Sequence, residues 1–118
     1  MHYTANGIAR VAHEAQRVLQ VVVNEPVPAP EWNHAPAYMK EALIKSVWAV
    51  LEGSTAEETH ELWLRDKIRD GWTYAPIKDA YAKTHPCLMD YDKLPQYQRD
   101  KNALLVAIVN ALANSLIA

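Results

Sequence analysis

The sequence predicts a small, mainly helical domain with four main helices and at most a small β element. Apolar residues recur at three- and four-residue spacing in several separate segments, which is the pattern of amphipathic helices. The chain has 118 residues and half of them are hydrophobic, which is enough for one core and too few for two. We therefore expect one domain that spans residues 1–118.

The first helix is expected over residues 5–23. Thr4 is placed to cap it, because the Thr hydroxyl can accept a free amide hydrogen of the first turn. The prolines of residues 25–30 exclude a helix there and predict an extended connector. The apolar face carries Ile8, Val11, Ala12, Ala15, Val18, Leu19 and Val22. The opposite face is polar, is expected to be largely solvated, and carries Arg10, His13, Arg17 and Gln20.

A second helix is expected to begin near Pro36, because proline suits the first turn, and to end before Gly53. Its apolar residues fall on two sides, so we expect this helix to lie between neighbouring helices. One side carries Met39, Ala42, Leu43, Val47 and Val50, and the other side carries Ile44, Trp48 and Leu51.

A third helix begins with a predicted capping box. Thr55 and Glu58 have the spacing at which each side chain bonds a free backbone amide at the helix start. The helix should run to about Asp70 and stop at Gly71, which we expect to take a left-handed backbone conformation.

The rest of the chain is expected to be an irregular segment followed by one more helix. Pro76 and Pro86 prevent a long element in residues 72–94. Residues 72–74 would form a strand only if a partner strand pairs with them. The last helix is expected over residues 95–117.

Charge and hydropathy exclude several classes of protein. The chain has 12 basic and 14 acidic side chains, whereas a general nucleic-acid binder carries a basic excess. The apolar stretch 103–118 is too short for a membrane span and is interrupted by Asn110 and Asn114. Residues 1–10 lack the apolar run of a signal peptide. We expect a cytoplasmic protein that does not act at a membrane, and leave open whether it forms a homo-oligomer.

The sequence favours neither catalysis nor a bound cofactor. His60-Glu61 lacks the second histidine of a metalloprotease helix, because position 64 is Leu. One cysteine and no dense carboxylate cluster make a zinc site improbable. Cys87 lies in an apolar stretch, and we expect it to be a buried structural thiol rather than a nucleophile. Three glycines are too few for a dinucleotide-binding or phosphate-binding loop.

The most informative stretch is residues 60–91, which mixes aromatic side chains with both signs of charge. His60, Trp63 and Lys67 share one helix face. Two interpretations of this face are open. Trp63 is either a core residue with polar neighbours at its edge or the wall of a pocket for a flat anionic ligand. Lys67 and His85 are expected to be partly exposed cations. The candidate ligand-binding residues are His60, Trp63, Lys67, Trp72, Tyr74, Lys78, Asp79, Lys83, His85 and Tyr91.

Residues 60–94 carry aromatic, charged, glycine and proline residues in this order: His60-Glu61-x-Trp63, Lys67, Gly71-Trp72-x-Tyr74, Lys78-Asp79, Lys83-x-His85-Pro86 and Tyr91-x-x-Leu94. This pattern resembles the RyR domain, the repeat module of the cytosolic part of ryanodine receptors, and in particular its standalone bacterial and phage forms. Upstream, residues 8–14 resemble the first helix of the microbial members. The chain departs from the family pattern at Ala75, where glycine is usual, and at Asp90, where proline is usual.

The resemblance implies a mostly helical fold with a small β element. In ryanodine receptors the domain serves as a docking and regulatory module, and binding of nucleotide-derived signals has been proposed for the microbial forms. We therefore expect a non-catalytic recognition module for a small anionic, nucleotide-derived ligand. The alternative is a module that docks a protein partner. A ligand site needs a concave pocket, whereas a docking site needs an exposed patch.

Overall fold

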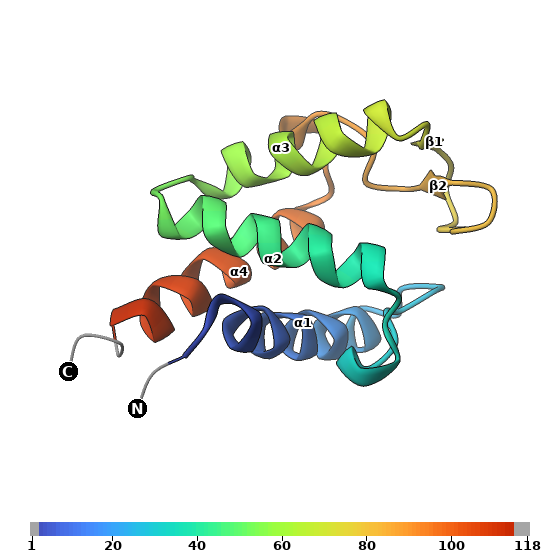
Figure 1. Ribbon diagram of the computed structural model, residues 1–118. Helices are drawn as coiled ribbons and strands as arrows, with labels where there is room; N and C mark the ends of the chain where they lie inside the picture. Colours follow the sequence, from blue (N-terminus) through green and yellow to red (C-terminus); the bar gives the residue numbers. More distant parts are fainter. Residues whose placement is uncertain (1–2, 115–118) are drawn as a thin grey trace.

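The computed structural model describes residues 3–114, and its helices form a bundle. Figure 1 shows α2 between α1 and α3, and α4 packs against all three. The mainly helical fold predicted from the sequence is confirmed. The elements are α1 (Ala5–Val22), η1 (Trp32–His34), α2 (Ala37–Leu51), α3 (Ala56–Arg69), β1 (Thr73–Tyr74), β2 (Thr84–His85), η2 (Tyr91–Lys93) and α4 (Gln96–Asn114), where η is a 3₁₀ helix.

The predicted helix starts are confirmed by their capping interactions. The Thr4 hydroxyl accepts the Gly7 amide at 3.0 Å. Thr55 and Glu58 form the complete capping box, in which each side chain bonds the other residue's amide, at 3.2 and 3.0 Å. These bonds satisfy amides that a helix start leaves free. Pro36 occupies the capping position just before α2 rather than the first turn.

The last helix begins at Gln96 and is described as far as Asn114. Its predicted end at residue 117 lies outside the described residues. Within residues 3–114, no helix combines the length and the hydropathy that crossing a membrane requires.

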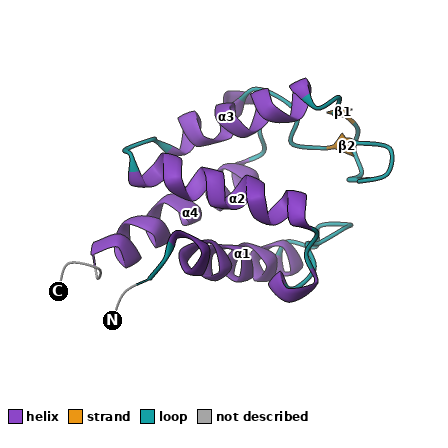
Figure 2. Cartoon of the chain, viewed as in Figure 1, coloured by secondary structure: helices purple, strands orange, loops and turns teal. Residues whose placement is uncertain are grey.

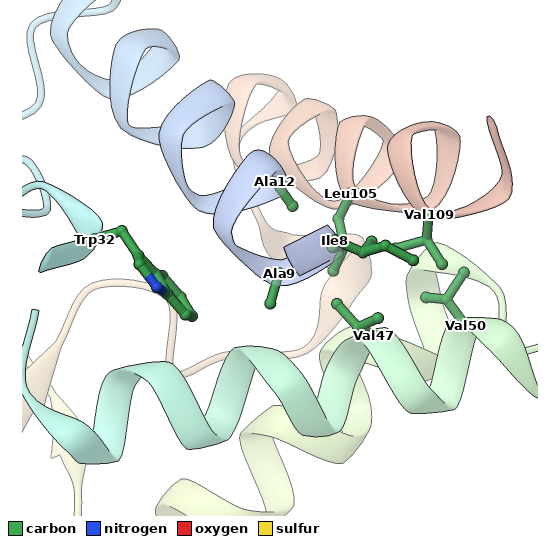
Figure 3. Packing of buried hydrophobic residues seen from close by; sticks show 8 residues of the cluster. All are labelled: Ile8, Ala9, Ala12, Trp32, Val47, Val50, Leu105 and Val109. Atoms are coloured by element: carbon green, nitrogen blue, oxygen red, sulfur yellow. The ribbon is translucent and has the colours of Figure 1, made fainter. Parts of the chain in front are cut away.

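The apolar core is built where α1, α2 and α4 meet. Figure 3 shows these helices each directing small or branched side chains into one cluster, which Trp32 of η1 flanks. Complete burial of an aliphatic side chain contributes about 1.5–3 kcal/mol, so the fully buried Ile8, Val47 and Val109 tie the three helices together. Trp48 was expected inside and is 53% exposed, whereas Ile44 and Leu51 of the same predicted face pack against the core.

The predicted apolar face of α1 is buried at Ile8 and Ala12 but not along the whole helix. Val18 and Val22 of the apolar face are 54% and 69% exposed, while His13 and Gln20 of the polar face are buried. The cause is the connector after α1, which folds back along the polar face. There His13 Nε2 donates a hydrogen bond to the Pro30 carbonyl at 2.7 Å. The expectation of a solvated polar face was therefore wrong for His13 and Gln20.

A short β pair follows α3, as Figure 2 shows. Strand β1 pairs in parallel with β2, with Thr73 opposite Thr84 and Tyr74 opposite His85. Residues 73–74 thus find the partner strand that the sequence could not identify. The pairing holds His85 near the end of α3, beside the helix face that carries Trp63.

Gly71 produces the turn that brings this segment back over α3. Its φ of 90° is left-handed, as predicted. The Trp72 amide bonds the Lys67 carbonyl at 2.9 Å and the Gly71 amide bonds the Ile68 carbonyl at 3.0 Å. These are the two hydrogen bonds of a Schellman motif.

We predict that Gly71→Ala destabilises the protein by about 1 kcal/mol, because an L-residue is strained at positive φ. A Cβ at Gly71 would meet no atom within 4 Å, so the cost is conformational and not steric. Denaturant unfolding measures it. Gly7→Ala, inside α1, is the control and should not destabilise. Equal stability of Gly71→Ala and the parent protein would contradict the prediction.

Candidate functional site

A cavity of about 200 Å³ lies among the four helices and the segment after α3. It is lined by apolar, aromatic, cationic and amide side chains. The structure brings six of the ten candidate residues together at this cavity. They are His60, Trp63, Lys67, Trp72, Lys78 and His85.

The other four candidate residues do not line the cavity. Tyr74 is 55% exposed. Asp79 Oδ1 accepts the amides of residues 81 and 82 at 3.0 and 3.2 Å and so closes a turn. Lys83 Nζ donates a hydrogen bond to the Asp70 carbonyl at 2.9 Å. The ring centres of Tyr91 and His60 lie 6.0 Å apart. These contacts give Asp79, Lys83 and Tyr91 structural roles in the segment that covers α3.

Lys67 places its ammonium group between two aromatic rings. Its Nζ lies 4.5 Å from the centre of the Trp72 ring and 4.8 Å from that of Tyr38. The residue is only 9% exposed, so the expectation of a partly exposed cation was wrong. Burial lowers the pKa of Lys67, although Asp70 and Asp66 raise it in part. The ring faces supply a favourable but incomplete substitute for water or a carboxylate.

Lys78 reaches the same cavity from the segment between the two strands. Burial lowers its pKa, and the nearby Lys101 lowers it further, while Glu25 opposes the shift. Among residues 3–114, neither Lys67 nor Lys78 has a hydrogen-bond or ion-pair partner for its ammonium group. Neither ammonium group is completely shielded from solvent.

His85 lines the cavity and its ring is neutral. Burial lowers its pKa to about 3, with Lys78 and Lys101 contributing. Its Nδ1 accepts the Cys87 amide at 3.0 Å, so the one proton of the neutral ring lies on Nε2. The expectation that His85 supplies positive charge was therefore wrong.

Trp63 and His60 form the aromatic wall on α3. The Trp63 ring meets the His85 ring edge-on, with centres 4.9 Å apart. His60 is buried and its Nε2 donates to the Met89 carbonyl at 2.8 Å. His60 therefore anchors the segment before η2 to α3, in addition to bordering the cavity.

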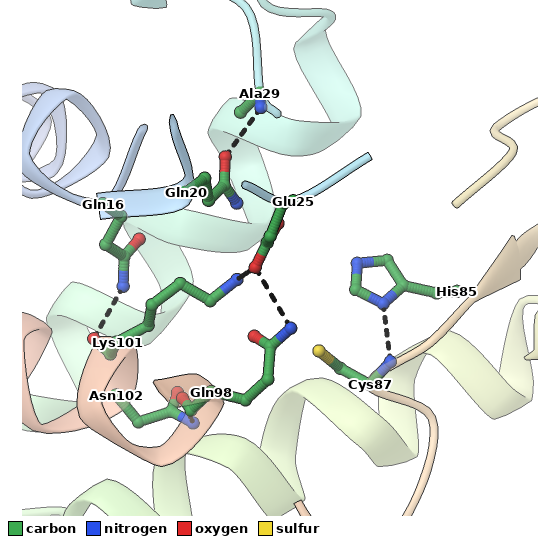
Figure 4. Close-up of polar contacts among 9 residues, drawn as sticks. All are labelled: Gln16, Gln20, Glu25, Ala29, His85, Cys87, Gln98, Lys101 and Asn102. Carbon is green, nitrogen blue, oxygen red and sulfur yellow. Dashed lines mark hydrogen bonds and ion pairs between the residues drawn. The ribbon is translucent and has the colours of Figure 1, made fainter. Parts of the chain in front are cut away.

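The opposite wall consists of residues that sequence reasoning did not select. Figure 4 shows polar side chains of α1 and α4 gathered across from His85 and Cys87. Glu25 accepts hydrogen bonds from Lys101 Nζ at 2.8 Å and Gln98 Nε2 at 3.1 Å. Lys101 is thus a paired cation, unlike Lys67 and Lys78. The lining residues of this wall include Gln16, Gln20, Gln98, Lys101 and Asn102.

The cavity contains one thiol, on Cys87, which is buried as the sequence predicted. Burial raises the pKa of Cys87 to about 11, so the thiol is protonated at neutral pH. Among the described residues, no three His, Cys, Asp or Glu side chains are placed to hold a metal ion.

A comparison with protein-family models adds an independent finding. The model described as the RyR domain matches residues 33–113, which is more than half of the chain. The match contains α2, α3, the β pair and nearly all of α4. It begins after α1, so it leaves the resemblance of residues 8–14 to the microbial members untested.

We predict that His85 makes the protein less stable as the pH falls from about 6.5 toward 3. In this window the unfolded histidine, with a pKa near 6.5, binds a proton that the folded one does not. The loss is at most about 1.4 kcal/mol per pH unit. Denaturant unfolding at several pH values measures this slope, and His85→Gln should reduce it. An NMR titration that protonates His85 near pH 6.5 in the folded protein would contradict the prediction.

Proposed function

The chain belongs to the RyR domain family, and we propose that it is a non-catalytic recognition module whose cavity binds a small anionic ligand. The observation that carries the proposal is the pair of unpaired ammonium groups, Lys67 and Lys78, that share one aromatic-walled cavity. A buried cation without a directly paired carboxylate is costly, and an anionic ligand would supply that partner.

The local charge of the cavity supports an anion even though the whole chain has a net charge of −2. Burial lowers the pKa of Lys67, and the charge of Lys78 contributes to the shift, because like charges repel. The His85 Nε2–H group provides an uncharged donor beside them. A phosphate group would offer acceptors to all three and relieve the repulsion.

Cavity size and ring placement favour a compact ligand with a flat part. The volume of about 200 Å³ is below the roughly 300–1,000 Å³ typical of sites for drug-sized molecules. Trp63 and Trp72 offer aromatic surface at the wall. A mononucleotide or a smaller phosphorylated compound suits these dimensions better than a dinucleotide held entirely inside.

The protonation states support recognition rather than catalysis. A thiol with a pKa of about 11 is a weak nucleophile at neutral pH. An imidazole with a pKa of about 3 is a poor general base there. The cavity therefore offers donors and cations to a ligand without an activated group to attack it.

A second candidate function is docking of a protein partner. Strand β1 and the segment that follows it expose Tyr74, Ile77 and Tyr81, at 55%, 50% and 100% of their surface. Exposed tyrosines are common anchors of protein interfaces. This surface is separate from the cavity lining, so the two functions call for different variants.

We predict that Lys67→Met and Lys78→Met each weaken phosphate-ligand binding at least tenfold, because each removes a charge-assisted hydrogen bond worth about 1.5–3 kcal/mol. Isothermal titration with inorganic phosphate and the four nucleoside 5′-monophosphates measures the affinities. Methionine keeps the apolar stem that packs between the rings, so Lys67→Met should leave the free energy of unfolding unchanged or higher.

Lys93→Met is the matched control, because Lys93 is 70% exposed and lies outside the cavity. It should bind like the parent protein. Absence of binding by the parent protein to every compound, or equal binding by all three variants, would contradict the ligand proposal. A loss of stability in Lys67→Met as large as its loss of binding would assign Lys67 to the core instead.

A further inference from the structure

Three amide side chains of the α1–α4 wall, those of Gln16, Gln20 and Asn102, have orientations fixed by hydrogen bonds to the backbone. The fourth amide, Gln98, bonds the Glu25 carboxylate instead. A carbonyl oxygen can only accept and a backbone N–H can only donate. The atom without any partner on each of these three amides is therefore determined, and an NH2 group that donates one hydrogen still keeps a second.

Gln16 and Asn102 each leave an acceptor free. Gln16 Nε2 donates to the Lys101 carbonyl at 2.9 Å, which leaves Gln16 Oε1. Asn102 Nδ2 donates to the Gln98 carbonyl at 3.3 Å, which leaves Asn102 Oδ1. The hydrogen bond from Gln16 to residue 101 also places Gln16 beside Asn102.

Gln20 leaves a donor free. Its Oε1 accepts a hydrogen bond from the Ala29 amide at 2.7 Å, as Figure 4 shows. The Nε2 donor of Gln20 therefore has no partner. Gln20 follows Gln16 by one helical turn, a spacing that puts their side chains about 5–6 Å apart. The two therefore present an acceptor and a donor side by side.

The free amide atoms remain within reach of a ligand. Within the described residues, two side-chain atoms are completely buried and lack a hydrogen-bond partner, Gln98 Oε1 and Arg99 Nε. The free atoms of Gln16, Gln20 and Asn102 do not belong to this group, and all three residues line the cavity.

We propose that this amide wall selects the uncharged part of the ligand, and that this part presents two donors and one acceptor. The proposal rests on the anion site proposed above, which would hold the phosphate on the side of Lys67 and Lys78. The two partner-free oxygens of Gln16 and Asn102 and the partner-free NH2 group of Gln20 complement the pairing edge of guanine, with its O6 acceptor and its N1–H and N2–H donors. Uracil presents the reverse pattern of two acceptors around one donor, and ribose 5-phosphate has no such edge.

The wall derives partly from outside the segment that matches the RyR family model. Gln16 and Gln20 lie on α1, whereas the match begins at residue 33. The cationic wall, by contrast, lies within the match. Selection of the uncharged group would thus depend partly on residues outside the matched segment.

Titration calorimetry with guanosine 5′-monophosphate, uridine 5′-monophosphate and ribose 5-phosphate tests the proposal on the parent protein. We expect guanosine 5′-monophosphate to bind at least tenfold more tightly than the other two. Equal affinities for the three compounds would overturn the amide-wall proposal while the anion site stands. Absence of binding by all three would overturn both proposals.

Gln20→Glu gives a sharper test, because it keeps the oxygen that accepts the Ala29 amide and replaces the free donor with an acceptor. It should reduce the preference for guanosine 5′-monophosphate over ribose 5-phosphate to about twofold or less. The ratio separates this effect from general repulsion of phosphate, which would weaken both compounds equally. Asn110→Asp introduces the same charge on an exposed position of α4 and should leave the ratio unchanged. An unchanged ratio in Gln20→Glu would overturn the proposal.

Discussion

The site depends on one interaction, the placement of the Lys67 ammonium group between the rings of Tyr38 and Trp72. A buried charge normally has a counter-charge nearby. Here two aromatic faces take part of that role, and each such contact is worth about 0.5–2 kcal/mol. The charge is thereby kept inside the bundle and remains available to an anion.

Several features of the fold serve this placement. The capping box starts α3 at a defined residue, which fixes the face on which Trp63 and Lys67 lie. The turn at Gly71 brings Trp72 back against Lys67. The pairing of β1 with β2 then sets His85 beside Trp63, and Lys78 enters the cavity from the segment between the strands. Each step is local in sequence except the strand pairing.

This locality explains what the sequence could predict. The helix face of His60, Trp63 and Lys67 follows from periodicity, and the left-handed Gly71 follows from its position after the helix. The convergence of Lys78 and His85 on that face follows from the reversal of the chain. The protonation state of His85 does not follow, because it depends on burial and on the hydrogen bond from the Cys87 amide.

The opposite wall could not be predicted because it depends on contacts between distant segments. Gln16 bonds the backbone of α4, and Glu25 pairs with Lys101, across 85 and 76 positions of the chain. Periodicity assigned the valines of α1 to the core, but the returning connector covers the polar face instead. Such a helix can turn either its valine face or its polar face toward the rest of the protein. Only the tertiary contacts decide between these two orientations.

The most direct test of the account measures the side-chain pKa values of Lys67 and Lys78 by NMR, with and without saturating inorganic phosphate. Both values should lie below the ordinary lysine value of about 10.4 in the free protein, because both side chains are largely removed from water. Phosphate should raise both, because the bound anion stabilises the charged form. Ordinary values in the free protein, or values that phosphate leaves unchanged, would contradict the claim that these two residues form an anion site.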